Sequence, residues 1–153
     1  MTGAQRLGTN LLAGVPFIGV DPHTCLNTVT GFYDPENTVA SNVNIATNPE
    51  RYGYREIPQN EAIPGDLIIL SDSNGHPNHA VMFDGVSDGR GISDNNYPIA
   101  PGDTLVNYSN GGRSSDNYRL QEPLKRFNDR KNAGGDFLGP RIYLRYTGKR
   151  EKK

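Results

Sequence analysis

The chain has 153 residues, the size of one ordinary domain. Only 34% of the residues are hydrophobic, and 18 glycines and 11 prolines predict a loop-rich chain rather than a helical bundle or a coiled coil. No apolar run approaches the roughly 20 residues of a membrane-spanning helix. The single cysteine excludes an internal disulfide framework and a cysteine-based zinc site.

The near-neutral net charge hides an uneven distribution. Residues 1–112 carry four arginines, no lysine and twelve acidic residues, whereas residues 113–153 carry twelve basic and five acidic residues. This balance excludes a uniformly basic nucleic-acid-binding protein. We expect one domain over residues 1–148 and a solvated basic tail at 149–153, with contact to an anionic polymer as the alternative for the tail.

The first half of the chain predicts helices. Ala4, Leu7 and Leu11 have helical spacing, which indicates a short amphipathic helix in the first dozen residues. The apolar stretch that follows is broken by glycine and proline and lacks a basic region before it, so no signal peptide is recognised. A second helix is expected to begin at Asp21 or Thr24 and to continue to about residue 33. Residues 36–62 are predicted to be irregular, with one weak helix near 38–46.

The second half predicts an antiparallel sheet. Short apolar runs between turn residues indicate strands at 67–70, 79–83, 104–108 and 141–146. The intervening segment 87–103 reads as a loop or an insertion, and residues 118–130 as a short surface helix. Helices followed by an antiparallel meander predict the α+β class.

Cys25 is the candidate nucleophile. Both predicted helix starts put it in the first helical turn, where the backbone dipole favours the thiolate, and a nearby imidazole would favour it further. The alternative is that Cys25 is a small buried apolar residue.

His79 is the candidate base, because it opens a predicted strand after a polar loop and has Val81 and Phe83 on its own face. A surface loop histidine is the alternative interpretation. His76 lies three residues earlier, but this offset suits neither a helix face nor one strand face, so we expect neither a metal nor another cofactor.

A third group should orient the imidazole through one ring nitrogen. Asn107 is the first candidate, because it is a polar residue within an apolar strand and would be costly there unless hydrogen-bonded. Ser109 is the second candidate and Asn110 the third. An outward-facing strand residue is the alternative for Asn107.

The order of these elements resembles a known superfamily. A cysteine at a helix start is followed by Pro-Gly-Asp-Leu-Ile-Ile-Leu at 64–70 and by His-Ala-Val-Met-Phe-Asp-Gly-Val at 79–86. This order looks like the NlpC-type and CHAP-type (cysteine, histidine-dependent amidohydrolase/peptidase) cell-wall hydrolases of the papain-like superfamily. The resemblance covers residues 20–110. Two departures are that Thr-Cys-Leu-Asn replaces the frequent Asp-Cys-Ser-Gly and that His79 and Asn107 are 28 residues apart, which makes 87–103 an insertion.

The resemblance implies a papain-like fold with N-terminal helices packed on a small antiparallel sheet. It implies that Cys25 is the nucleophile, His79 the general base and acid, and Asn107 the orienting group, with the Cys25 backbone N–H as one oxyanion donor and His23 a guess for the second. The implied activity is hydrolysis of an amide bond in peptidoglycan stem peptides, or of the amide that joins them to the glycan, without a cofactor.

Without an export signal, such an enzyme would be made in the cytoplasm and reach the cell wall by another route. Secretion as an antibacterial toxin, release at phage lysis and carriage in a virion stay open, with an immunity protein or a phage particle as the corresponding partner. A fragment of a larger exported protein is the fourth possibility. Three other functions also stay open: a non-catalytic structural or binding part, for instance of a phage particle, a papain-like enzyme for other amides, and a glycan-recognition module.

Overall fold

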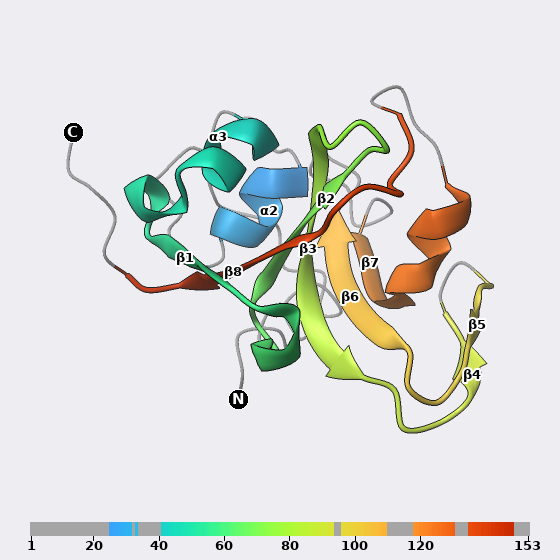
Figure 1. Cartoon of the computed structure of the whole chain (residues 1–153). Coiled ribbons are helices and arrows are strands. Elements are labelled where there is room, and N and C mark those ends of the chain that lie inside the picture. The colour runs from blue at the N-terminus through green and yellow to red at the C-terminus, as the bar shows by residue number, and fades with distance from the viewer. Residues whose placement is uncertain are drawn as a thin grey trace.

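The computed structural model of the chain describes residues 25–31, 33, 41–93, 96–109, 118–130 and 135–148 (Figure 1). Over these residues the fold is mixed α and β, with one six-stranded antiparallel sheet, a two-stranded ribbon and few helices. The predicted α+β class is confirmed at this level. The expected helix in the first dozen residues, and residues 21–24, lie outside the described part of the chain.

The large sheet has the strand order β1-β8-β2-β3-β6-β7. Its strands are β1 (Tyr54–Ile57), β2 (Leu67–Ser71), β3 (Pro77–Val86), β6 (Thr104–Ser109), β7 (Tyr118–Pro123) and β8 (Ile142–Tyr146). The predicted strands at 67–70, 79–83, 104–108 and 141–146 are therefore all present. The second half is a meander from β2 to β7, but β8 then returns to pair between β1 and β2.

Helix α2 (Cys25–Gly31) confirms that Cys25 lies in the first turn of a helix. The weak helix expected near 38–46 is α3 (Asn42–Thr47), where the Ser41 hydroxyl caps the first turn by accepting from the N–H of Asn44 at 3.1 Å. Three 3-10 helices complete the described helices: η1 (Pro49–Tyr52), η2 (Gln59–Glu61) and η4 (Leu124–Asp129).

Three sequence predictions need correction. The region 36–62 is not irregular throughout, since it contains strand β1. The segment 87–103 contains the two-stranded ribbon β4 (Gly91–Ile92) and β5 (Pro98–Ile99). The predicted helix at 118–130 is helical only in its second half, because residues 118–123 pair with β6 as strand β7.

The sheet has a core on each face, because alternate residues of every strand point to opposite sides. One core, here the helix-side core, joins α2 and α3 to the sheet through Leu26, Val29, Ile45, Tyr54, Leu67, Ile69, Ala80, Met82 and Leu144. The other, here the aromatic-side core, contains Ile57, Ile68, Leu70, Val81, Phe83, Val106, Tyr108, Leu124, Phe127, Phe137 and Tyr143. The candidate residues described below are divided between these two sides of the sheet.

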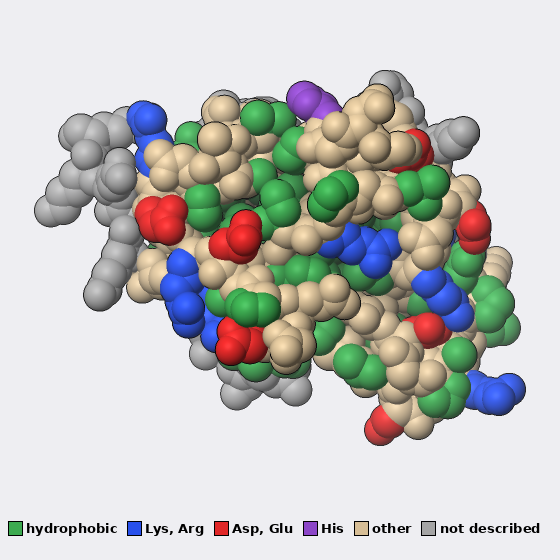
Figure 2. All heavy atoms as spheres, viewed as in Figure 1, with side chains coloured by type: hydrophobic (Ala, Val, Ile, Leu, Met, Phe, Trp, Pro, Cys, Tyr) green, Lys and Arg blue, Asp and Glu red, His purple; other side chains and the backbone are tan. Residues whose placement is uncertain are grey.

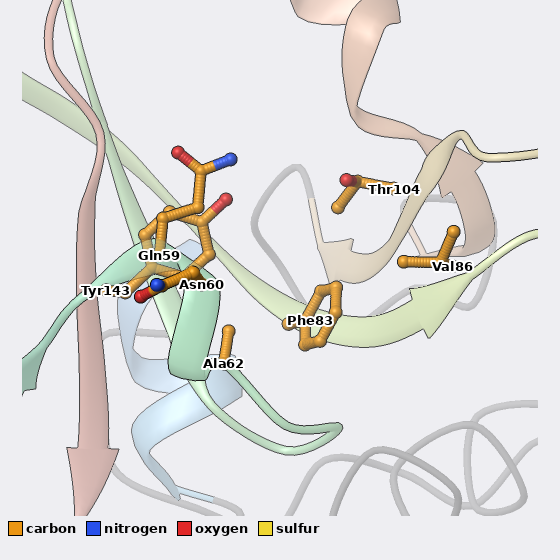
Figure 3. A pocket seen from close by; sticks show the side chains of 7 residues that line it. All are labelled: Gln59, Asn60, Ala62, Phe83, Val86, Thr104 and Tyr143. Atoms are coloured by element: carbon orange, nitrogen blue, oxygen red, sulfur yellow. The ribbon is translucent and has the colours of Figure 1, made fainter.

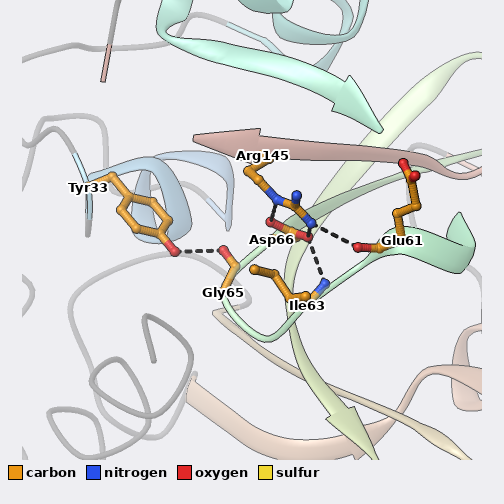
Figure 4. A network of polar contacts seen from close by, with 6 residues as sticks. All are labelled: Tyr33, Glu61, Ile63, Gly65, Asp66 and Arg145. Atoms are coloured by element: carbon orange, nitrogen blue, oxygen red, sulfur yellow. Dashed lines mark hydrogen bonds and ion pairs between the residues drawn. The ribbon is translucent and has the colours of Figure 1, made fainter. Parts of the chain in front are cut away.

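The Pro-Gly-Asp turn before β2 is fixed by a polar network (Figure 4). The Asp66 carboxylate accepts from Nε of Arg145 at 3.1 Å, from its NH2 at 3.0 Å, and from the Ile63 N–H at 2.9 Å. The Tyr33 hydroxyl donates to the Gly65 carbonyl at 2.8 Å. The turn thereby connects the segment after α2 with β2 and β8, which explains why an aspartate is required there.

Gly139 marks a close approach between two loops. Its N–H donates to the Ser71 carbonyl at 2.9 Å, and a Cβ there would overlap the Asp72 carbonyl oxygen and lie 2.7 Å from the carbonyl carbon. We expect Gly139→Ala to lower the free energy of unfolding by about 2 kcal/mol, because backbone has to move to relieve the overlap. Urea denaturation measures the change. Gly91→Ala is the control, since a Cβ there meets nothing within 4 Å, and equal stability of the two variants would contradict the prediction.

Within the described residues, no helix is long and apolar enough to cross a membrane. On the face shown in Figure 2, basic and acidic side chains of the described residues are interspersed rather than gathered into a region of one sign.

Candidate active site

Cys25 lies at the first position of α2, half-buried against strand β3. Burial raises the pKa of its thiol above 9.0, and hydrogen bonds from the backbone of Ala80 and Leu26 and from the Asn42 side chain oppose the increase. The sulfur therefore lies beside the backbone of the residue that directly follows His79.

Asn42 is a neighbour of the sulfur that the sequence analysis missed. It is the first residue of α3, and its Oδ1 is buried without a hydrogen-bond partner. Ser41 as a helix cap was readable from the sequence, but no local pattern connects the next residue to a cysteine 17 positions earlier. The Asn42 amide supplies a donor for a thiolate at Cys25.

The side chain of His79 lies on the other side of the sheet. Its ring is 6% exposed and packs in the aromatic-side core, with centroids 5.3 Å from Phe127, 5.4 Å from Tyr108 and 5.7 Å from Phe137. Burial, with a smaller contribution from the charge of Arg130, lowers the pKa of His79 to about 3. Nε2 is buried and has no hydrogen-bond partner. In this arrangement the imidazole stays neutral at physiological pH.

The pleat of β3 separates the two predicted catalytic groups. His79 shares its side with Val81 and Phe83, as predicted, but that side faces the aromatic core, whereas Ala80 faces α2. A β-bulge between Leu70 and Ser71 lies directly opposite, where the register changes from Leu70↔His79 to Ser71↔Pro77. The expectation that the His79 imidazole reaches Cys25 is therefore not met in this conformation.

Asn107 lies on the same side of the sheet as Cys25. It pairs opposite Met82 of the helix-side core. Its Oδ1 accepts the Gln121 N–H at 2.8 Å, and Gln121 has a φ of 51° beside the register shift between β6 and β7. Asn107 thus holds this irregular pairing in the present structure instead of orienting His79.

The other predicted positions add little to the site. Ser109 is fully buried at the end of β6. Asn110 and His23 lie outside the described residues. Among the residues that the structure does describe, no group of three His, Cys, Asp or Glu side chains is arranged to hold a metal ion.

A buried carboxylate on the aromatic side of the sheet was also missed. Glu122 pairs opposite Val106 in β7, is 0% exposed, and neither of its carboxylate oxygens has a hydrogen-bond partner. Burial raises the pKa of the neighbouring Tyr108, whose hydroxyl accepts from Arg126 NH1 at 3.0 Å. A surface helix over 118–130, as the sequence predicts, would leave this acid in solvent, so its burial is not indicated by the sequence.

Comparisons with protein-family models, with characterised proteins and with solved structures find no significant match to this chain.

Proposed function

We propose that the chain is a cysteine-dependent amide hydrolase with a papain-like layout of helices on an antiparallel sheet, acting on bacterial peptidoglycan peptides. Cys25 is the nucleophile and His79 the general base and acid. The observation that supports this proposal most is the contact of the Cys25 sulfur with the backbone of Ala80, next in the chain to His79. Asn107, on the same side of the sheet as Cys25, is the orienting group.

The proposal requires His79 to change sides. If the backbone at His79 rotated so that this residue faced the opposite side of β3, the imidazole would move from the aromatic-side core to the side of Cys25 and Asn107. The β-bulge opposite His79 favours such a rotation, because strand pairing is already interrupted there. The Asn107 side chain carries an amide oxygen, which accepts the Gln121 N–H here, and amide oxygens are also acceptors for an imidazole N–H.

In the proposed reaction, His79 takes the proton of Cys25 and the thiolate attacks the carbonyl carbon of the amide. The carbonyl oxygen becomes an oxyanion near the backbone N–H of Cys25. His79 then protonates the leaving amine, the C–N bond breaks and a thioester remains. Water, deprotonated by His79, attacks the thioester and releases the acid and the thiol.

Digestion of purified peptidoglycan, followed by mass spectrometry of the soluble fragments, tests this function and identifies the bond cut. We expect the native chain to release peptide fragments, and Cys25→Ala and His79→Phe each to lower the release to that of a buffer blank. His79→Phe keeps a ring in the aromatic core but cannot carry a proton. His76→Gln, at an exposed histidine, is the matched control and should retain activity.

Intact peptidoglycan after incubation with the native chain, or full activity of Cys25→Ala, would refute the hydrolase. The second candidate function is a non-catalytic structural or binding part with the same fold. The enclosure of His79 by three aromatic rings favours it, because a base with a pKa of about 3 is a poor catalyst at neutral pH. For this candidate neither the native chain nor any variant releases fragments.

A further inference from the structure

A groove on the aromatic side of the sheet is separate from the Cys25 site. It has a volume of about 560 Å³ and is lined by Gln59, Asn60, Ala62, Phe83, Val86, Thr104 and Tyr143 (Figure 3). In Figure 3, Gln59, Asn60 and Tyr143 lie at one side of the groove and Thr104 and Val86 at the other, with Phe83 between them. Phe83 and Tyr143 belong to the aromatic-side core, whereas Cys25 packs with the helix side.

The lining offers neutral hydrogen-bonding groups that the fold leaves free. Tyr143 lines the groove and is only 4% exposed, and among the described residues its hydroxyl has no hydrogen-bond partner. Within the same described ranges, the amides of Gln59 and Asn60 and the hydroxyl of Thr104 also form no hydrogen bond. Four groups that both donate and accept thus surround one aromatic ring.

The uncharged lining of the groove limits the chemical classes of ligand that it can bind. None of its lining residues is acidic or basic, so it offers no ion pair to a phosphate, a carboxylate or an ammonium group. Its polar rim is also unlike a lipid site, which would be apolar throughout. The ligand that fits is uncharged and rich in hydrogen-bonding groups.

The strand order argues against an extended peptide as the ligand of this groove. Peptides that add to a sheet need a free strand edge, whereas the lining strands β3, β6 and β8 are each paired on both sides. Recognition here must use side chains alone. Amides and hydroxyls around an aromatic ring suit the hydroxyls and apolar C–H face of a sugar ring.

We propose that this groove binds a neutral saccharide, with the largely buried Phe83 at its floor and Gln59, Asn60, Thr104 and Tyr143 hydrogen-bonded to its hydroxyl or N-acetyl groups. A second hollow of about 290 Å³ shares Gln59 with the first and extends to Asn128 and Arg141. The two hollows therefore adjoin at Gln59. The proposal does not depend on hydrolysis by Cys25.

The test is an amide chemical-shift titration of the Cys25→Ala chain with chitotetraose and, separately, with cellotetraose and tetra-alanine. Using Cys25→Ala keeps the result independent of catalysis. We expect at least one saccharide to cause saturable shifts at residues 59–62, 83–86, 104 and 143 within about 10 mM ligand. Absence of saturation with both saccharides, or saturation with tetra-alanine alone, would overturn the proposal.

Tyr143→Phe in the same background isolates one hydrogen bond. Because the variant removes no hydrogen bond to a described residue, stability should be unchanged while saccharide affinity falls about fivefold. Tyr52→Phe is the matched control, since it also removes a hydroxyl, from a tyrosine packed on the helix side, and should leave affinity unchanged. Equal affinity of Tyr143→Phe and the parent chain would overturn the assignment of this hydroxyl to the site.

Discussion

Lowering the pH from 7 to 4 is expected to destabilise the chain by about 3 kcal/mol through His79 alone. In the folded state burial, helped by Arg130, lowers the pKa of His79 from 6.5 to about 3. Below pH 6.5 the unfolded chain therefore binds a proton that the folded chain does not. The stabilisation is complete above pH 6.5 and is lost progressively as the pH falls toward 3.

The measurement is urea denaturation at pH 4, 5, 6 and 7 for the native chain and for His79→Phe. Carboxylates titrate in the same range in both proteins, so the difference between the two curves isolates His79. Phenylalanine retains ring packing with Tyr108, Phe127 and Phe137, and the variant should lose about 1.4 kcal/mol less per pH unit below pH 6. His76→Gln, at an exposed site, should behave like the native chain.

Parallel pH profiles for the native chain and His79→Phe would place the imidazole outside the aromatic core. That outcome would favour the conformation that the proposed hydrolase needs, with His79 beside Cys25. The experiment therefore measures which side of β3 the ring occupies in solution, and does so without a substrate.

The strands that the sequence predicted well are those with long apolar runs. Leu67–Leu70 and His79–Phe83 are buried on both sides, so their hydrophobicity alone indicated strands. β1 was missed because its four residues follow the order buried, exposed, exposed, buried, which has no period of two. The surface helix predicted over 118–130 is wrong in its first half, where Tyr118–Pro123 forms β7, and only Leu124–Asp129 is helical.

The candidate site shows a different limit of prediction from the sequence. Period-two alternation correctly placed His79 with Val81 and Phe83, and the turn signals correctly placed Cys25 in a first helical turn. Alternation cannot say which side of the sheet a helix covers, because that depends on packing between segments distant in sequence. In the structure α2 packs over Ala80 and Met82, so the two correctly placed residues do not bring their side chains together in this conformation.

Asp66 belongs to the Pro-Gly-Asp-Leu segment noted in the sequence, and it also has a structural role that the sequence did not indicate. Its carboxylate is 4% exposed and pairs with a guanidinium that is 26% exposed, 79 residues away. The pairing raises the pKa of Arg145, chiefly through the hydrogen bonds with Asp66. The motif that resembles a hydrolase signature is thus also the connection between β2 and β8.

Asp66→Ala is expected to lower the free energy of unfolding by about 3 kcal/mol, because it leaves the guanidinium partly buried and unpaired. It also removes the acceptor for the Ile63 N–H. Arg145→Met should cost a similar amount, since it leaves the carboxylate buried without its cation. Chemical denaturation of both variants at pH 7 measures the effects.

The double variant Asp66→Ala/Arg145→Met separates pairing from packing. Because no uncompensated charge remains, we expect it to be more stable than either single variant. Lys125→Met provides the comparison, since Lys125 and Asp103 form a more exposed pair at 2.8 Å, and its change should stay within about 0.5 kcal/mol. Strictly additive losses in the double variant would show that Asp66 and Arg145 stabilise the turn independently, and would contradict a coupled pair between β2 and β8.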